Sequence, residues 1–182
     1  RISVSGACEA VRMSLNNAFD ETERALLLRQ LRGQRQHILA QLEGLSDAQL
    51  RAPVLPSGWS CLGLVRHLTL SDERYWFEAV MAGGPLDFWP EGDNADWKVA
   101  EDEPAEAVID AYRAAAEHSD AFIEANSLAT PPAQPERWWA DVGMSFPDLR
   151  SVLVHVLVET AVHAGQLDAT RELLDGKQYI VL

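Results

Sequence analysis

Four long segments of this chain repeat apolar residues at three- and four-residue steps, the spacing that gathers them on one side of an α-helix. This spacing predicts helices over about 21–43, 60–81, 102–126 and 145–176. Glycine and proline interrupt the chain between them, and the only stretch that resembles a strand is a short tail at 179–181. Four long amphipathic helices with two long connections predict an all-α fold, a four-helix bundle with long loops.

The predicted bundle accounts for most of the chain. Residues 1–20 have only a weak pattern, so we expect them to form an N-terminal extension, with the bundle domain over 21–182. Ser46 and Gln49 have the spacing of a capping box and predict a short helical turn. The two long loops carry tryptophans, which we expect either to roof a pocket or to pack over the ends of the bundle. These are Trp89, Trp97, Trp138 and Trp139.

The charge balance argues against two classes of partner. With 15 basic and 28 acidic residues the net charge is −13, the opposite of the basic surface that binds nucleic acid or anionic lipid. No apolar run is long enough to span a bilayer, and the first ten residues lack the apolar stretch of a signal peptide. Cys8 and Cys61 form no disulfide framework, so we expect reduced thiols and a cytoplasmic protein, with Cys61 packing as a small apolar residue.

The last predicted helix carries a polar stripe. Residues 152–165 are mostly apolar, which predicts a helix buried nearly all round. Four polar residues interrupt it and share an arc of about 80° at about 100° per residue. These are His155, Glu159, His163 and Gln166. Since an unpaired buried carboxylate is very unfavourable, Glu159 requires a cation, a buried arginine or a metal ion beside it.

A divalent metal ion is one answer to this requirement. Glu159 and His163 are four residues apart, so they lie one above the other on the helix and can hold one ion. His67 is the candidate third ligand, because it lies mid-helix in an apolar stretch of a different segment. Three protein ligands leave a position open for substrate, as in catalytic zinc sites; nickel and iron are alternatives to zinc. The competing explanation is an internal polar network in which Arg66 or Arg171 neutralises Glu159.

The other polar residues near the stripe have weaker assignments. We expect His155 to support a ligand or to form a pocket wall rather than to be a fourth ligand, and Gln166 and Arg171 to have similar roles. An ion pair between Asp168 and Arg171 at the surface is the simpler expectation for those two residues. His37 in the first predicted helix and His118 in the third are expected to be solvated.

Several stretches together resemble the DinB-like superfamily of metalloenzymes. The stretches on which the resemblance rests are EGLSDAQL at 43–50, PSGWS at 56–60, LGLVRHL at 62–68, RYWF at 74–77 and HVLVETAVHAGQLDATRE at 155–172. The resemblance extends over about 23–176. It is closest to the branch that is similar to the N-terminal domain of mycothiol-dependent maleylpyruvate isomerase.

The resemblance implies a four-helix bundle that holds a metal ion through His67, Glu159 and His163. It implies a mycothiol-type S-transferase active in detoxification, in which a metal-bound thiolate of a low-molecular-weight thiol attacks a small electrophile. Many relatives carry histidine where this chain has Gln166; if that position contributes to the site in those relatives, the chemistry differs here. In the isomerase a second domain follows the bundle, and this chain ends at Leu182, so that isomerase activity is not implied.

Three alternatives stay open beside this function. A metal-bound hydroxide would give a hydrolase without a thiol. A closed or absent metal site would give a non-enzymatic, metal-binding stress-response bundle. A pure dimerisation module would need an apolar outer face and no metal. A homodimer is expected from the resemblance.

Overall fold

The computed structural model describes residues 4–179, with side chains described from residue 19 onward. The elements in chain order are α1 (Val4–Leu42), α2 (Asp47–Arg51), α3 (Cys61–His67), η1 (Leu68–Met81), η2 (Ala95–Trp97), α4 (Ala105–Ala125), η3 (Arg137–Val142) and α5 (Leu149–Asp175). Over 4–179 every regular element is helical, which confirms the predicted all-α fold. Within the same residues no helix combines the length and apolar character needed to cross a membrane.

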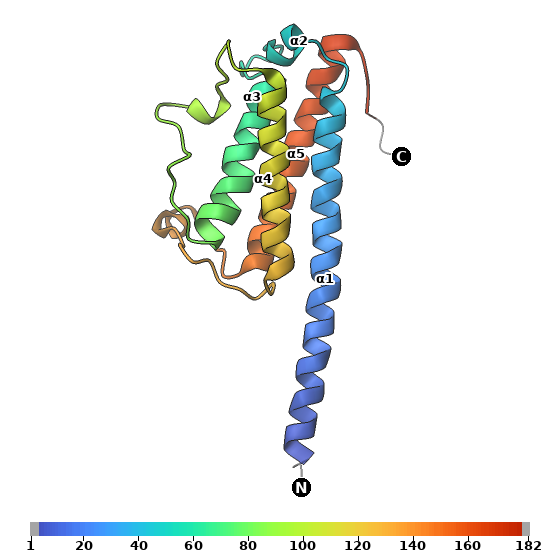
Figure 1. Ribbon diagram of the computed structural model, residues 1–182, viewed down its shortest axis with the longest axis vertical. Helices are drawn as coiled ribbons and strands as arrows, with labels where there is room; N and C mark the ends of the chain where they lie inside the picture. The colour runs from blue at the N-terminus through green and yellow to red at the C-terminus, as the bar shows by residue number, and fades with distance from the viewer. Residues whose placement is uncertain (1–3, 180–182) are drawn as a thin grey trace.

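The four long helices lie side by side as a bundle (Figure 1). α1 is longer than predicted: it begins at Val4 rather than near residue 21, and its first half extends beyond the other helices (Figure 1). The expected N-terminal extension is therefore helical over 4–20, although its sequence has only a weak pattern. The predicted strand at 179–181 falls almost entirely outside the described residues, and Tyr179 is not in a strand.

Side-chain caps define the starts of α2, α3 and α5. The predicted capping box is confirmed, because the Ser46 side chain accepts from Gln49 N and Gln49 reaches back to the Ser46 backbone. Ser60 caps α3 by accepting from Gly63 N. Asp148 caps α5 and bonds reciprocally with Ser151, so α5 begins at Leu149 and the predicted start near residue 145 was too early. The caps arise from local hydrogen bonds that satisfy the free N–H groups of the first turn.

The second predicted helix changes its hydrogen-bonding register midway. α3 continues without a break into η1, which is a π-helix over Leu68–Met81 with i→i+5 bonds. Its wider turn places two adjacent acidic residues, Asp72 and Glu73, inside the bundle. Arg35 of α1 neutralises Glu73 through two hydrogen bonds of 2.7 and 2.6 Å and also bonds Asp120 of α4.

The buried ionic group lies within a core formed by two apolar clusters. One cluster contains Phe77 and Leu153, and the other contains Ile38 and Leu167. Cys61 belongs to the second cluster and has no exposed surface, which confirms its prediction as a packing residue. Burial raises the pKa of its thiol to about 11.

One face of α5 lies outside this core. Val154, Val158 and Val162 expose 44%, 52% and 51% of their surface. The prediction that residues 152–165 are buried nearly all round was therefore wrong: the helix buries one side and presents a valine stripe to solvent. Uniform apolar composition could not distinguish a buried helix from one with an exposed apolar face.

Candidate functional site

Two of the predicted metal ligands lie side by side between the second and last long helices. His67 ends α3 and His163 lies in the middle of α5. Their ring centroids are 5.1 Å apart, with the rings at 75° to each other. The apolar stretch around each residue folds both helices against the core, so the two imidazoles meet at its edge.

Each of these rings is oriented by a hydrogen bond at Nδ1. His67 Nδ1 lies 2.6 Å from Asp96 Oδ2, and His163 Nδ1 lies 2.9 Å from Gln166 Oε1. Histidines that ligate metals commonly use one ring nitrogen in this way and offer the other to the ion. Burial lowers the pKa of His67, with His163 adding to the effect and Asp96 opposing it, so the ring favours the neutral form that binds metals.

A loop covers His67 from outside the bundle. Trp97 stacks on the imidazole, with centroids 4.0 Å apart and the planes at 17°. Gly63 permits this approach, because a Cβ there would lie 2.5 Å from the Trp97 carbonyl oxygen. Trp59 packs at 6.2 Å from Trp97 and supports the same corner.

Glu159 lies on the same side of α5 and is half-buried. No hydrogen bond or ion pair joins it to another described side chain, but its charge opposes the burial that lowers the pKa of both His67 and His155. The two arginines predicted as its neutralising partners are engaged elsewhere. Arg66 pairs with Glu103, and Arg171 pairs with Asp175 and donates to the carbonyl oxygens of Gln41 and Glu43. That form of the polar-network explanation was wrong.

The donor set fits a divalent metal ion in its chemistry. Two imidazoles with oriented Nδ1 atoms and an unpaired, half-buried carboxylate are the ligand types that zinc takes. Over residues 19–179, however, no group of three or more His, Cys, Asp or Glu side chains is gathered closely enough to hold an ion. The structure brings His67 and His163 together and leaves Glu159 outside their immediate cluster.

An aromatic hollow of about 390 Å³ lies farther along the same two helices. Its lining combines aromatic rings with a few polar groups. The lining residues are Ser71, Tyr75, Trp76, Trp89, Glu136, Trp138, Met144 and His155. The His155 ring packs against Trp76 and Phe146, both with centroids 4.9 Å away, and burial lowers its pKa. His155 thus lies in a pocket wall, one of the roles considered for it.

The four loop tryptophans divide between the two predicted roles. Trp89 and Trp138 line the aromatic hollow, and Trp97 covers His67. Trp139 is buried in the core, where it stacks on Trp76 with centroids 5.6 Å apart. Sequence position alone did not separate the two roles.

Four further polar predictions have clear outcomes. His37 is not solvated: it bonds Asp168 at 2.7 Å and stacks on Tyr179. Asp168 therefore does not pair with Arg171, and that prediction was wrong too. His118 is exposed, as predicted. Gln166 is exposed, and its side-chain oxygen forms the hydrogen bond with His163 Nδ1.

Sequence reasoning missed Asp96, the carboxylate that orients His67. The residue precedes Trp97 in a long loop, and no helical spacing links it to residue 67. A carboxylate beside a tryptophan in a long loop was the only available signal.

Comparison with known proteins gives one family match. A family model described as Mycothiol-S-transferase matches residues 26–176, which include the second half of α1, the other three long helices, and His67, Glu159 and His163. No curated protein and no solved structure matches the chain.

Proposed function

Because the chain belongs to the mycothiol S-transferase family, a DinB-like family, we propose that it transfers mycothiol or a similar small thiol to an electrophilic molecule in a detoxification reaction. The observation that carries the proposal is the His67–His163 pair, whose Nδ1 atoms are both held by hydrogen bonds. The similarity to the isomerase branch is a narrower part of the same proposal.

In this proposal His67, His163 and Glu159 hold a divalent metal ion, with zinc as the first choice. Such an ion would lower the pKa of a bound thiol so that the thiolate is present at neutral pH. Asp96 and Gln166 keep the two imidazoles oriented, and Trp97 limits the access of water to His67. Glu159 has to turn toward the histidine pair, and its lack of an ion-pair partner among residues 19–179 leaves it free to do so.

The aromatic hollow is the proposed site of the electrophile. Tyr75, Trp89 and Trp138 offer flat surfaces for an apolar body, and about 390 Å³ suits a small molecule. His155 at its wall favours the neutral state and can accept a proton there. In a substitution, the thiol loses its proton, its sulfur forms a bond to the electrophilic carbon, and the leaving group departs with the electron pair of its bond.

Metal content tests this proposal first. The protein is purified without an affinity tag or chelator and its metals are measured, beside His163→Ala and His118→Ala. His118 is the matched control, because it is an exposed histidine outside the site. We expect near-stoichiometric metal in the wild type and in His118→Ala and its loss in His163→Ala. Protein that stays metal-free on titration with zinc, nickel and iron would overturn the metal assignment.

Activity is the second test. Mycothiol and 1-chloro-2,4-dinitrobenzene are incubated with each protein, and the conjugate is measured. We expect formation above the uncatalysed rate with the wild type and the His118→Ala control and not with His163→Ala. Equal rates for all three proteins would refute the S-transferase proposal for this electrophile and thiol.

A homodimer in the cytoplasm is also part of the proposal. The valine stripe of α5 supports it, because side chains about half exposed on one helix face gain by burial against a second copy. Light scattering tests it with Val158→Glu, and Val142→Glu is the control because Val142 is 61% exposed in η3. We expect dimers that only Val158→Glu dissociates; a monomeric wild type would contradict the dimer.

A further inference from the structure

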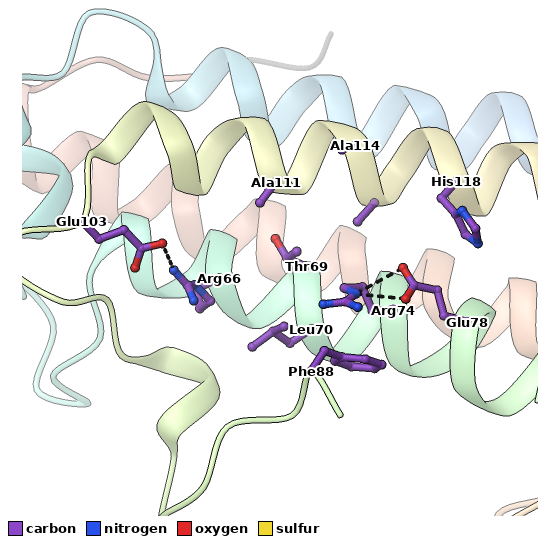
Figure 2. Close-up of a pocket in the computed structure, with 11 residues that line it drawn as sticks. Arg66, Thr69, Leu70, Arg74, Glu78, Phe88, Glu103, Ala111, Ala114 and His118 are labelled. Carbon is purple, nitrogen blue, oxygen red and sulfur yellow. Dashed lines mark hydrogen bonds and ion pairs between the residues drawn. The ribbon is translucent and has the colours of Figure 1, made fainter. Parts of the chain in front are cut away.

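A second hollow lies on the other side of η1 from the aromatic one. It runs between η1 and α4 and encloses about 530 Å³ (Figure 2). Neighbouring residues alternate between the two hollows: Leu70 and Arg74 line this one, whereas Ser71 and Tyr75 line the aromatic one. The two hollows share no lining residue, so this groove is separate from the site described above.

Small residues on α4 create the space. Ala111, Ala114 and Ala115 face the groove, and their short side chains leave room between the helices. Leu70 of η1 and Phe88 of the following loop add apolar surface. An apolar body fits this part of the groove.

The polar part of the groove has unused hydrogen-bond donors. Arg66 bonds Glu103 through Nη2 alone, and Arg74 bonds Glu78 through Nε alone (Figure 2). A guanidinium group carries five N–H donors, so most donors of both arginines are free of protein acceptors among residues 19–179. His118 also lines the groove and, within the same residues, makes no hydrogen bond or ion pair.

These arginines are accessible and one of them is preorganised. The Arg66 and Arg74 side chains are 26% and 33% exposed. The guanidinium carbon of Arg74 lies 4.0 Å from the centre of the Phe88 ring, which holds the plane against the groove wall. Partly exposed ion pairs are weak, so an incoming anion can share both arginines with their glutamates.

We infer that this groove binds a small amphipathic carboxylate. The acid group bonds the free N–H donors of Arg74, and the apolar body lies over Phe88 and the α4 alanines. The glutamates balance the charge of the arginines, so the ligand is recognised by donors and shape rather than by a basic patch. The inference is independent of the proposed transferase chemistry.

The experiment measures binding of 4-phenylbutanoate by isothermal titration calorimetry. 4-Phenylbutan-1-ol and 4-phenylbutylamine have the same body with a neutral or cationic end. Ala111→Leu places a larger side chain in the groove, and Ala121→Leu makes the same change at an exposed position of α4 outside the groove. Arg74→Ala removes the guanidinium donors, with unfolding monitored in parallel. Arg74→Lys keeps the charge but removes the planar guanidinium.

We expect the carboxylate to bind at least about tenfold more tightly than the alcohol, since hydrogen bonds to charged groups are the stronger ones. Ala111→Leu and Arg74→Ala should abolish this preference, and Ala121→Leu and His163→Ala should retain it. Undetectable binding of the carboxylate, equal binding of all three probes, or unchanged binding by Ala111→Leu would each overturn the inference.

Discussion

Replacing Arg35 with methionine tests the ionic group inside the bundle. The Arg35 and Glu73 side chains expose only 5% and 0% of their surface, and two N–H···O bonds of 2.7 and 2.6 Å join them across α1 and η1. Methionine fills much of the arginine stem volume but leaves the Glu73 carboxylate without its cation. Asp72 lies next to it in the same interior.

The expected loss follows from the unpaired charge. Removing one partner of a buried ion pair costs about 3–5 kcal/mol, whereas replacing both by apolar residues is often neutral. Arg35→Met should therefore lower the free energy of unfolding by about 3–5 kcal/mol, a large share of the roughly 5–15 kcal/mol of a typical domain. The double variant Arg35→Met, Glu73→Leu should recover most of it. Asp120 keeps Arg32 as a partner in both variants.

Urea unfolding at neutral pH, followed by circular dichroism, measures these differences by linear extrapolation. Glu106→Leu is a suitable control for an exposed acidic residue, because its pair with Arg113 is at the surface. The reasoning is refuted if Arg35→Met costs less than about 1 kcal/mol, the range of surface pairs. It is equally refuted if the double variant is as unstable as the single one, because the loss would then come from packing.

Three further changes have definite expected results. Burial and Glu73 hold the pKa of Asp72 well above its usual range, so the folded state keeps a proton that the unfolded chain has lost, and stability falls as pH rises above about 4. Asp72→Asn should therefore be more stable than the wild type at about pH 8 and gain nothing at about pH 3, measured by urea unfolding; a gain independent of pH would contradict this. Gly63→Ala would put a Cβ 2.5 Å from the Trp97 carbonyl oxygen, so we expect the free energy of unfolding to fall by about 1–3 kcal/mol and the tryptophan fluorescence spectrum to change. An unchanged spectrum would show that the loop does not depend on this contact. Asp96→Asn should weaken zinc binding by about 10–100-fold in competition with a chelator, and equal affinity would exclude an orienting role.

The fold was predictable because its signals are local. The periodicity of the apolar residues located all four long helices, and Ser46 with Gln49 predicted a cap that the structure contains. Two helix starts were predicted too early: α4 begins at Ala105 rather than near residue 102 and α5 at Leu149 rather than near residue 145, because Pro104 and Asp148 lie just before these helices. The early half of α1 was missed because residues 4–20 have no strong apolar spacing.

The site was predictable only where helices carry it. Polar residues in an apolar helix identified His163, and the same logic on another helix identified His67, which lies beside it. Asp96 and Trp97 reach His67 from a loop, and loop paths depend on tertiary contacts that spacing does not encode. The partners of Arg66, Asp168 and Arg171 were wrong for the same reason, since each pairing was decided by which helices become neighbours.

The π-helical register of η1 makes the length of this segment as important as its composition. His67 lies just before the π-helix, and Ser71 and Tyr75 lie within it. Deleting one residue between them would shorten this stretch, and each residue that follows would turn by about 100° around the axis. The histidine pair and the aromatic hollow would then face different directions although every side chain that forms them was still present. Chains that keep these residues but lack the extra turn length would therefore not inherit the site.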